Sequence, residues 1–383
     1  MKLPLFSSSA PRYAERGVTL SASTVAYTDD WMHTLLDQMA MMRLNTLLWE
    51  VKISGAQGWP QTDQPFVTPQ EAQSIVRYAA DRGITVIPEV NAPGHMRTWL
   101  SEYPEYAITD ATGEKDLERL DVTNEQAKRW YWNLIEKYCS IFTADEWHMG
   151  ADEFENKLDN RTYADYPHLA HWAVDTYGSQ AKPWDPITAF INETNAFLSG
   201  CGKKLRIWND GQRLGGVVPL DSDITVEYWL DKGVEGGYYT PQQFAQMGHS
   251  LVNVPQYLYF SRSEKHIYDP QPQEIFEGAR KYLDLFDGDQ FLTNLQACRG
   301  VRFSLWPDRA ECQTPAEVLR EARDILILLG QIAWDGEILH TTWKEFKFYA
   351  DSLDLPPIPN DEGEVYTVNS CEQRKQNHGD KDE

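Results

Sequence analysis

The sequence predicts an α/β protein folded as a single (β/α)8 TIM barrel. Eight short runs rich in β-branched and aromatic residues alternate with longer stretches whose apolar residues have helical spacing. This alternation is typical of parallel strands joined by crossover helices, and eight strands are the number that closes such a barrel. The expected strands are Gly17–Ser21, Thr46–Ile53, Thr85–Val90, Glu146–Gly150, Leu205–Trp208, Thr225–Tyr228, Ser250–Val254 and Val301–Leu305.

Several helix starts carry the same local signal, a proline directly behind a threonine or an aspartate. Proline suits the first helical position because its missing N–H would have no intrahelical partner, and the residue before it caps the helix. These starts are Thr68-Pro69, Asp185-Pro186, Thr240-Pro241 and Thr314-Pro315. The expected helices are Asp29–Arg43, Pro69–Arg82, Asn124–Phe142, Pro186–Ser199, Pro241–Met247 and Pro315–Gly330, with an irregular, helix-bearing insertion at Ser261–Phe286.

The chain of 383 residues is expected to form one domain over residues 1–354, followed by a tail at 355–383 that is partly disordered because it is polar and proline-rich. It carries 35 Lys+Arg against 58 Asp+Glu, a formal charge of −23. Nucleic acids and anionic membranes attract positive surfaces, so neither is an expected partner. No apolar run approaches the roughly 20 residues that a membrane span needs.

The five cysteines are scattered and contain no CxxC pair, so neither a disulfide framework nor a thiolate metal site is expected. This usage and an N-terminus too short in apolar residues for a secretory signal together favour a cytoplasmic location. The sequence contains no HExxH motif and no glycine-rich phosphate loop. We therefore expect no metal ion and no cofactor.

A pair of carboxylates directly follows one expected strand. In barrels of this kind the active site is built at the carboxyl ends of the strands. Glu146–Gly150 runs through Ala151 into Asp152 and Glu153, and the small residues allow the backbone to bend there. Like charges this close raise one pKa, so that one carboxyl acts as an acid while the other stays ionised. The alternative is an ordinary acidic pair at a helix start.

Aromatic residues recur at the ends of the four strands that follow. An indole offers a flat apolar face with a polar edge, which suits the faces of a sugar ring. Simple filling of the core is the other explanation, but barrel interiors are normally lined by branched aliphatic residues. The four strand ends read Trp208-Asn209-Asp210-Gly211, Tyr228-Trp229, Tyr257-Leu258-Tyr259 and Leu305-Trp306-Pro307-Asp308. Aromatic walls around paired carboxylates favour a glycoside pocket.

Taken in order, these segments resemble glycoside hydrolase family 20, the β-N-acetylhexosaminidases, and especially its single-domain, dispersin B-like members. The most specific element is His148-x-Gly150-Ala151-Asp152-Glu153, which looks like the family's H-x-G-[GA]-D-E signature. The supporting elements are Arg16-Gly17, IPEVNAPGH at Ile87–His95, IWNDG at Ile207–Gly211 and LWPD at Leu305–Asp308.

The resemblance implies substrate-assisted catalysis with retention, in which the substrate's own acetamido oxygen attacks C1 to give an oxazolinium intermediate. By resemblance, Asp152 holds the acetamido N–H and Glu153 is the general acid and base. Tyr257 looks like the tyrosine that bonds the acetamido oxygen, with Tyr259 close enough to take its place in the alignment. His95 looks like the histidine that supports the acid.

The same resemblance assigns the substrate-binding residues. It implies that Arg16 binds the 3- and 4-hydroxyls and that Asp308 contacts the 4- or 6-hydroxyl, one methylene shorter than the usual glutamate. Tryptophans would line the sugar and acetamido pocket. The remaining residues of the expected substrate-binding set are Glu50, His148, Trp208, Asp210, Trp229 and Trp306.

Four positions depart from the family pattern. Ser21 and Thr24 stand where an aspartate and an arginine are usual, Glu50 replaces the histidine and aspartate of the strand-two loop, and Asn91 replaces an aspartate. The relay behind His95 thus lacks its usual aspartate. We hypothesise that Glu50 substitutes as a partner for His95 or for a substrate hydroxyl.

The expected function is that of an exo-β-N-acetylhexosaminidase that removes terminal N-acetylglucosamine, or its galactosamine epimer, from an oligosaccharide. One alternative is a non-catalytic barrel that binds sugar. Another is a hexosaminidase for a 6-substituted or β-1,6-linked substrate. A homodimer that completes the mouth of the barrel is a further hypothesis about partners.

Overall fold

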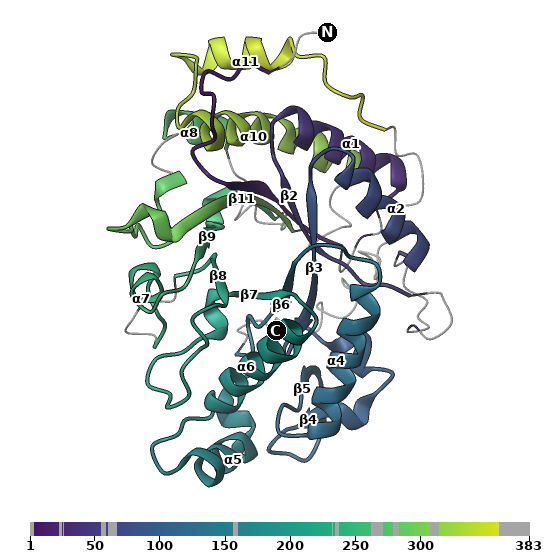
Figure 1. Ribbon diagram of the computed structural model, residues 1–383, viewed down its shortest axis with the longest axis vertical. Helices are drawn as coiled ribbons and strands as arrows, with labels where there is room; N and C mark the ends of the chain where they lie inside the picture. Colours follow the sequence, from purple (N-terminus) through teal and green to yellow (C-terminus); the bar gives the residue numbers. More distant parts are fainter. Residues whose placement is uncertain are drawn as a thin grey trace, which may run out of the picture. The chain divides into compact units, whose positions relative to one another are not determined.

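The computed structural model describes residues 4–22, 25, 27–54, 59, 67–155, 160–231, 233, 237–261, 271–278, 283–306 and 314–359 (Figure 1). The expected tail beyond residue 359 lies outside this range. The described chain divides into two compact units. The first comprises Met1–Val86, Gln256–Leu283 and Val301–Glu383, and the second comprises Ile87–Pro255 and Asp284–Gly300.

The main sheet has the strand order of a closed (β/α)8 barrel, as the sequence predicts. Its strands follow one another as β1-β2-β3-β6-β7-β8-β9-β11, and β1 also pairs with β11, while the short β10 pairs with the far side of β11. The pairs β1–β2, β3–β6, β6–β7, β7–β8 and β8–β9 are parallel. The bounds are β1 Glu15–Ser21, β2 Thr46–Glu50, β3 Thr85–Ala92, β6 Glu146–Gly150, β7 Lys204–Trp208, β8 Thr225–Tyr228, β9 Leu251–Asn253, β10 Tyr259–Ser261 and β11 Cys298–Trp306.

In the first unit, the long helix α10 packs against α1, α8 and α11 and contacts β1, and α1 packs against α2 (Figure 1). Most of the α10 residues from Ile325 to Ala333 are buried, which fits a helix surrounded by neighbours. The bounds are α1 Asp29–Met41, α2 Pro69–Ala80, α8 Pro272–Glu277, α10 Pro315–Asp335 and α11 Trp343–Asp351, with a single 3-10 turn at Gln256–Leu258.

In the second unit, α6 packs against α4 and α5, and a two-stranded antiparallel hairpin, β4–β5, follows the short helix α3 (Figure 1). The bounds are α3 Arg97–Leu100, β4 Ala107–Thr109, β5 Lys115–Leu120, α4 Glu125–Cys139, α5 Pro167–Tyr177, α6 Asp185–Gly200 and α7 Pro241–Gln246. Single 3-10 turns lie at Pro104–Tyr106, Tyr163–Asp165, Asn209–Gly211 and Leu295–Ala297.

Three of the four proline-marked helix starts have the expected cap. The hydroxyls of Thr68, Thr240 and Thr314 each accept a backbone N–H, and the residue three positions on returns the bond to complete a capping box. The fourth start is different. Asp185 is the first residue of α6 rather than its cap, and its carboxylate accepts backbone N–H groups from Lys182, Val217 and Val218.

The elements not expected from the sequence include the β4–β5 hairpin, the short strand β10 and helices α3, α5 and α11. Strand β2 ends at Glu50, three residues before its expected end. Within the expected insertion at Ser261–Phe286, the described part contains α8 at Pro272–Glu277. These differences lie in connections and strand ends, so the order of the barrel elements is unchanged.

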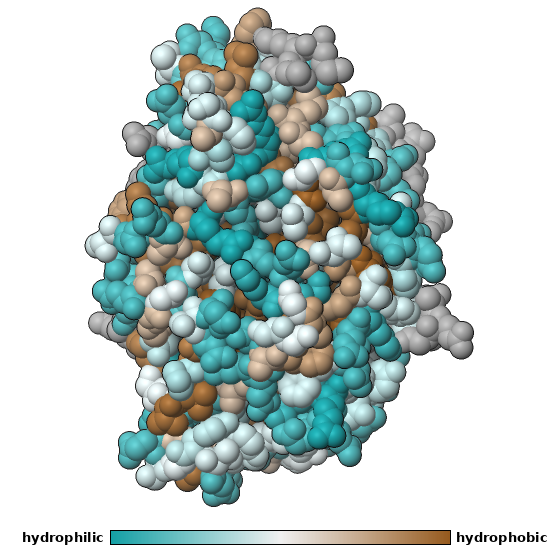
Figure 2. Space-filling view, viewed as in Figure 1, coloured by the Kyte–Doolittle hydropathy of each residue, from teal (hydrophilic) through white to brown (hydrophobic). Residues whose placement is uncertain are grey.

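Hydrophilic residues are interspersed with single or small groups of hydrophobic residues over the face shown in Figure 2. None of the helices that the structure describes combines the length and the apolar character needed to cross a bilayer.

Candidate active site

The candidate site of the second unit is built where β6 ends, on a backbone that L-amino acids rarely adopt. Gly150, Ala151 and Glu153 have φ angles of 69°, 69° and 50°. A Cβ at Gly150 would lie 2.1 Å from the side chain of Asn91, so only glycine fits at that position. Left-handed backbone at Ala151 and Glu153 carries strain, and strain of this kind concentrates at functional sites.

Two adjacent carboxylates on this loop share one histidine. The Nε2 atom of His95 lies 3.4 Å from Oδ2 of Asp152 and 3.5 Å from Oε2 of Glu153. The other Asp152 oxygen, Oδ1, accepts a hydrogen bond of 2.6 Å from the side-chain amide of Asn91. The three ionisable side chains are partly exposed, 35% for His95, 15% for Asp152 and 26% for Glu153, so a ligand can reach them.

Charge compensation sets the ionisation of this cluster. Burial opposes the charged form of His95, but the carboxylates of Asp152 and Glu153 outweigh it and hold the pKa of His95 well above 6.5. Burial also opposes the charged form of Asp152, yet His95 and the amide of Asn91 lower the pKa of this carboxyl. At neutral pH the arrangement therefore favours a charged imidazolium beside an ionised Asp152.

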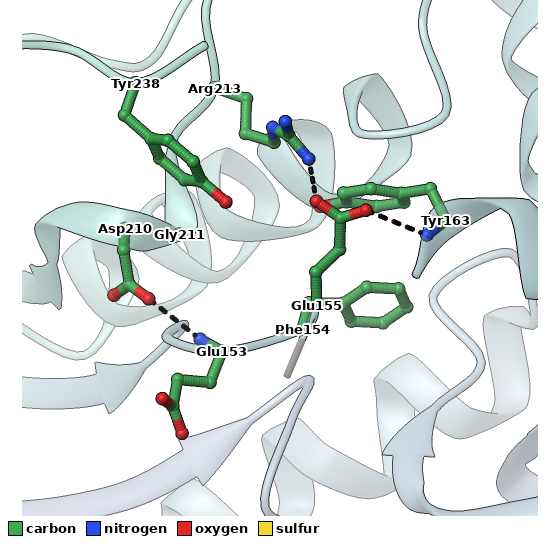
Figure 3. Close-up of a pocket in the computed structure, with 8 residues that line it drawn as sticks. All are labelled: Glu153, Phe154, Glu155, Tyr163, Asp210, Gly211, Arg213 and Tyr238. Carbon is green, nitrogen blue, oxygen red and sulfur yellow. Dashed lines mark hydrogen bonds and ion pairs between the residues drawn. The ribbon is translucent and has the colours of Figure 1, made fainter. Parts of the chain in front are cut away.

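The turn after β7 anchors the backbone of the acidic loop, residues 151–155. Oδ2 of Asp210 accepts the backbone N–H of Glu153 at 3.2 Å (Figure 3), and Oδ1 of Asp210 accepts the indole N–H of Trp229 at 2.9 Å. The backbone N–H of Trp229 donates to the side chain of Asn209 at 2.8 Å. A carboxylate that is only 6% exposed thus connects the acidic loop with an aromatic residue of the β8 end.

A small pocket lies beside the loop (Figure 3). The carboxylate of Glu155 points into it and forms an ion pair with Arg213, while its Oε1 accepts the backbone N–H of Tyr163 at 3.0 Å. The Arg213 guanidinium lies over the rings of Tyr163, Trp184 and Tyr238. The lining residues are Glu153, Phe154, Glu155, Tyr163, Asp210, Gly211, Arg213 and Tyr238.

His148 and Trp208 belong to a buried network in the strands. His148 lies 3.5 Å from Glu89 through Nδ1 and 3.4 Å from Glu227 through Nε2, and all three are essentially unexposed. The indole N–H of Trp208 donates to Glu89 at 2.8 Å, and Trp208 is 1% exposed. The structure therefore places these two expected substrate-binding residues within the packed interior, in contact with carboxylates from other strands of the sheet.

Other expected site residues lie in the first unit. Glu50 ends β2 opposite Ser21 at the end of β1, and the Ser21 hydroxyl donates to Glu50 at 2.5 Å. Tyr257 lies in the turn Gln256–Leu258 and is half-buried, and Trp306 ends β11, also half-buried. The contact described for Glu50 is this bond with Ser21, and the hypothesis that Glu50 partners His95 or a substrate hydroxyl stays a prediction. Asp308 and Thr24 lie outside the described residues.

Arg16 lies at the wrong end of its strand for the expected role. It is the second residue of β1, whereas Ser21 and Glu50 mark the carboxyl ends of β1 and β2. Five residues along a strand span about 16 Å. The guanidinium is buried and donates to the backbone carbonyls of Tyr13, Ala14 and Arg43. This placement gives Arg16 a structural role instead of the substrate contact that the resemblance implied. The expectation was wrong because the Arg-Gly motif alone does not specify at which end of the strand the arginine lies.

The carboxylate cluster is also the place where a metal ion would find donors. Of the described residues, His95, Asp152 and Glu153 form the one group of three such side chains whose donor atoms lie within 4.8 Å of one another. The sequence shows no metal-binding spacing there because His95 comes from the β3 loop and the carboxylates come from the β6 loop.

The sequence analysis gave no role to several residues that shape the site. Glu155, Arg213 and Tyr238 build the pocket, and Glu89 and Glu227 surround His148. A usable signal exists for the last two, since a charged residue within a strand buried on both faces needs a partner. The pocket residues carry no such signal, because they lie in loops whose conformation the sequence does not determine.

The comparisons with known proteins agree with this geometry. Residues 60–318 match the family model for the catalytic domain of glycosyl hydrolase family 20. The chain is 35% identical over 353 residues to a lacto-N-biosidase from Bifidobacterium bifidum, which covers 90% of this chain and 30% of that protein. It is 26% identical over 379 residues to β-hexosaminidase subunit A1 from Dictyostelium discoideum, covering 92% and 63%. The chain thus spans less than two thirds of each of these relatives.

Solved structures show the same fold at low identity. A family 20 exo-β-N-acetylglucosaminidase from Vibrio harveyi has a TM-score of 0.69 and 18% identity, covering 89% of this chain and 57% of that one. Dispersin B has a TM-score of 0.65 and 17% identity, covering 84% and 99%.

Proposed function

Because this chain belongs to glycosyl hydrolase family 20, we propose that it hydrolyses terminal β-linked N-acetylhexosamine residues by substrate-assisted catalysis. The observation that carries the proposal is the adjacent pair Asp152 and Glu153 sharing Nε2 of His95 at 3.4 and 3.5 Å. This chemistry needs one ionised carboxylate that holds the acetamido group and an adjacent carboxyl group that serves as acid and base.

Asp152 suits the first role, which is to hold the acetamido group while its oxygen attacks C1. Positive charge develops on that group as the ring closes, and a preorganised carboxylate stabilises it. Burial disfavours the charged form of Asp152, but His95 and Asn91 overcome this and lower its pKa, so it is ionised when substrate binds. The amide of Asn91 fixes one oxygen at 2.6 Å and so orients the carboxylate.

Glu153 suits the second role, protonating the departing glycosidic oxygen and then taking a proton from the attacking water. Retention is part of the proposed mechanism, because the attacking group comes from the substrate and the water enters only after the leaving group departs.

The first experiment compares the wild type with Glu153→Gln on an aryl β-N-acetylglucosaminide and on its galactosamine epimer. Removing a general acid and base typically lowers the rate about 10²- to 10⁴-fold. Glu105→Gln changes an exposed carboxylate of the same unit and serves as the matched control, with unchanged kcat expected. Equal rates in wild type and Glu153→Gln would overturn the assignment of the acid.

A thiazoline analogue of the oxazolinium distinguishes the enzyme from a non-catalytic sugar-binding barrel. An enzyme complementary to its transition state binds such an analogue at least about 10²-fold more tightly than the product sugar. Calorimetric titration with the analogue and with N-acetylglucosamine measures this ratio. Similar affinities for both, without turnover, would favour the binding barrel.

Proton NMR of the anomer released first tests retention, with the β anomer expected.

A second candidate substrate is a lacto-N-bioside, after the name of the Bifidobacterium bifidum relative. In such a substrate the N-acetylhexosamine at the scissile bond carries a further sugar. Two observations favour it: the identity of 35% to that relative, and the shorter side chains Ser21 and Thr24 where the family pattern has an aspartate and an arginine. Loss of long polar side chains suits a sugar whose ring hydroxyl is substituted.

Paired aryl glycosides decide between the two candidates. Aryl lacto-N-bioside and aryl β-N-acetylglucosaminide are offered separately, and the released sugar is identified by mass spectrometry. A kcat/KM ratio above about 10 in favour of the disaccharide, with an intact disaccharide as product, supports the second candidate. The opposite ratio rejects it in favour of the simple hexosaminidase.

A further inference from the structure

The charged side chains of the pocket in Figure 3 are directed at the acidic loop itself. Asp210 accepts the backbone N–H of Glu153, and the Glu155 carboxylate is held by Arg213 and by the backbone of Tyr163. Polar groups that bind a ligand are usually aimed into open space. Here they connect protein to protein, so the pocket is better understood as a support for the loop than as a ligand site.

The loop needs such a support because of its backbone. Glu153 has a φ of 50°, a conformation that is unfavourable for a non-glycine residue and persists only where the surroundings impose it. The turn after β7 lies directly against the loop, since a Cβ at Gly211 would be 2.3 Å from the carbonyl oxygen of Ala151. This close approach is what brings the Asp210 carboxylate to the N–H of Glu153.

The support holds the loop on both sides of the acid. Asp210 bonds the amide of Glu153 itself at 3.2 Å. Two residues further on, Glu155 is tied to Arg213, whose guanidinium is fixed between the rings of Tyr163 and Tyr238 at 5.7 and 4.9 Å. An ion pair with aromatic rings around its cation has few alternative conformations. The backbone is therefore held at the amide of Glu153 and again two residues later at Glu155.

We propose that Asp210 and the Glu155–Arg213 ion pair position the general acid Glu153, and that Asp210 couples it to the sugar pocket through Trp229. Its Oδ1 holds the indole N–H of Trp229 at 2.9 Å while its Oδ2 holds the acid's backbone. The Asp210 carboxylate thus binds both the backbone of Glu153 and the indole of Trp229. The sequence-based expectation that Asp210 binds substrate is replaced by this indirect role, and the inference rests on the proposed function.

Positioning of an acid has a specific kinetic signature. Protonation matters most when the leaving group is a poor one, such as the alkoxide of another sugar, and matters little when the aglycone leaves as a stable anion. A misplaced acid therefore lowers kcat/KM for alkyl and oligosaccharide substrates and spares kcat/KM for activated aryl substrates, because kcat/KM does not include the later step in which Glu153 takes a proton from water. General loss of folding or of sugar binding affects both classes alike.

The experiment measures kcat and KM for Asp210→Asn on methyl and 2,4-dinitrophenyl β-N-acetylglucosaminides. A charge-assisted bond of this kind contributes roughly 10- to 100-fold. We expect kcat/KM, which reports the steps up to departure of the leaving group, to fall by about that factor on the methyl glycoside and by less than about 3-fold on the dinitrophenyl glycoside, with KM on the methyl glycoside nearly unchanged. Glu155→Gln tests the second anchor and is expected to show the same selectivity with a smaller loss.

Asp185→Asn is the matched control. Its carboxylate is also buried and also accepts backbone N–H groups, from Lys182, Val217 and Val218, but these lie outside the acidic loop. Any loss there should be equal for both substrates. If the wild type is active and Asp210→Asn loses both activities equally, the positioning inference is overturned while the proposed function stands. If the wild type cleaves neither glycoside, the proposed function fails and this inference fails with it.

Discussion

Two histidines of the second unit each lie between two carboxylates, yet their surroundings differ. His95 contacts Asp152 and Glu153 at 3.4 and 3.5 Å, and His148 contacts Glu89 and Glu227 at 3.5 and 3.4 Å. The groups and distances are nearly the same. What differs is access from solvent.

The His148 cluster is closed. Its three side chains are at most 1% exposed, and Glu227 is also paired with Arg206 at 2.9 Å. Arg206 in turn contacts Glu146, which Arg299 also binds at 2.9 Å. Buried charges are tolerated when each has a partner and its hydrogen bonds are made. A network of this kind fixes strand positions and has no capacity left for a substrate.

The His95 cluster is open. Its side chains are 15 to 35% exposed, and it lies on loops with left-handed backbone rather than within strands. One imidazole, that of His95, faces the carboxylates of both Asp152 and Glu153. A histidine between two carboxylates can therefore hold strands together where it is buried, or take part in catalysis where solvent and substrate reach it.

The largest expected effect on stability comes from opening the closed cluster. Arg206→Met leaves Glu227 and Glu146 without the guanidinium between them, and breaking a buried pair in this way costs about 3–5 kcal/mol of unfolding free energy. Urea denaturation measures it. Arg299→Met is the matched control, because that side chain is 34% exposed and its pair is worth at most about 1 kcal/mol. Similar losses for both variants would contradict the distinction.

A smaller effect is expected where the open cluster depends on a glycine. Gly150→Ala places a Cβ 2.1 Å from the side chain of Asn91, which must then move away from Asp152. Gly215→Ala has a similar φ, 82° against 69°, but open space around its Cβ, so it isolates the cost of the backbone conformation. We expect Gly150→Ala to lose about 1–3 kcal/mol more than the control, as overpacking typically does. Equal losses would mean that Asn91 yields without cost.

The smallest effect is a dependence on pH. The pKa of His95 is raised in the folded protein, so its interaction stabilises the fold fully below the unfolded value of about 6.5 and is lost as pH rises through the folded pKa. His95→Gln should therefore destabilise the protein at pH 5.5 and have a smaller effect at pH 9.5. Urea midpoints at the two values test this. A difference that grows with pH would reverse the sign and reject an imidazolium between the carboxylates.

The barrel was predictable from sequence because its signals are local. Strands β6 and β8 have the expected bounds, Glu146–Gly150 and Thr225–Tyr228, since each is a short run that contains an aromatic residue and follows an aspartate-bearing turn. Thr68-Pro69 marks its helix start because the cap involves only neighbouring residues. Helix α5 was missed since it begins behind Tyr166, which makes no side-chain cap.

The site was predictable in composition but not in arrangement. The residues Asp152, Glu153 and His95 follow from the motifs, whereas the left-handed backbone of Ala151 and Glu153 does not, because neither residue is a glycine. Trp208 was expected in the sugar pocket, but its indole N–H is bound to Glu89. The sequence shows that an aromatic residue ends a strand, and only the packing decides which way its ring points.

The pairing of β1 with β11 also bears on how the chain is made. Arg302 of β11 donates to Thr19 of β1, which precedes it by 283 residues. At a synthesis rate of about 5–20 residues per second, β1 waits roughly 15 to 55 seconds for this neighbour to leave the ribosome. During that interval one edge of β1 is open to other strands, so the emerging chain is exposed to aggregation until its last strand arrives.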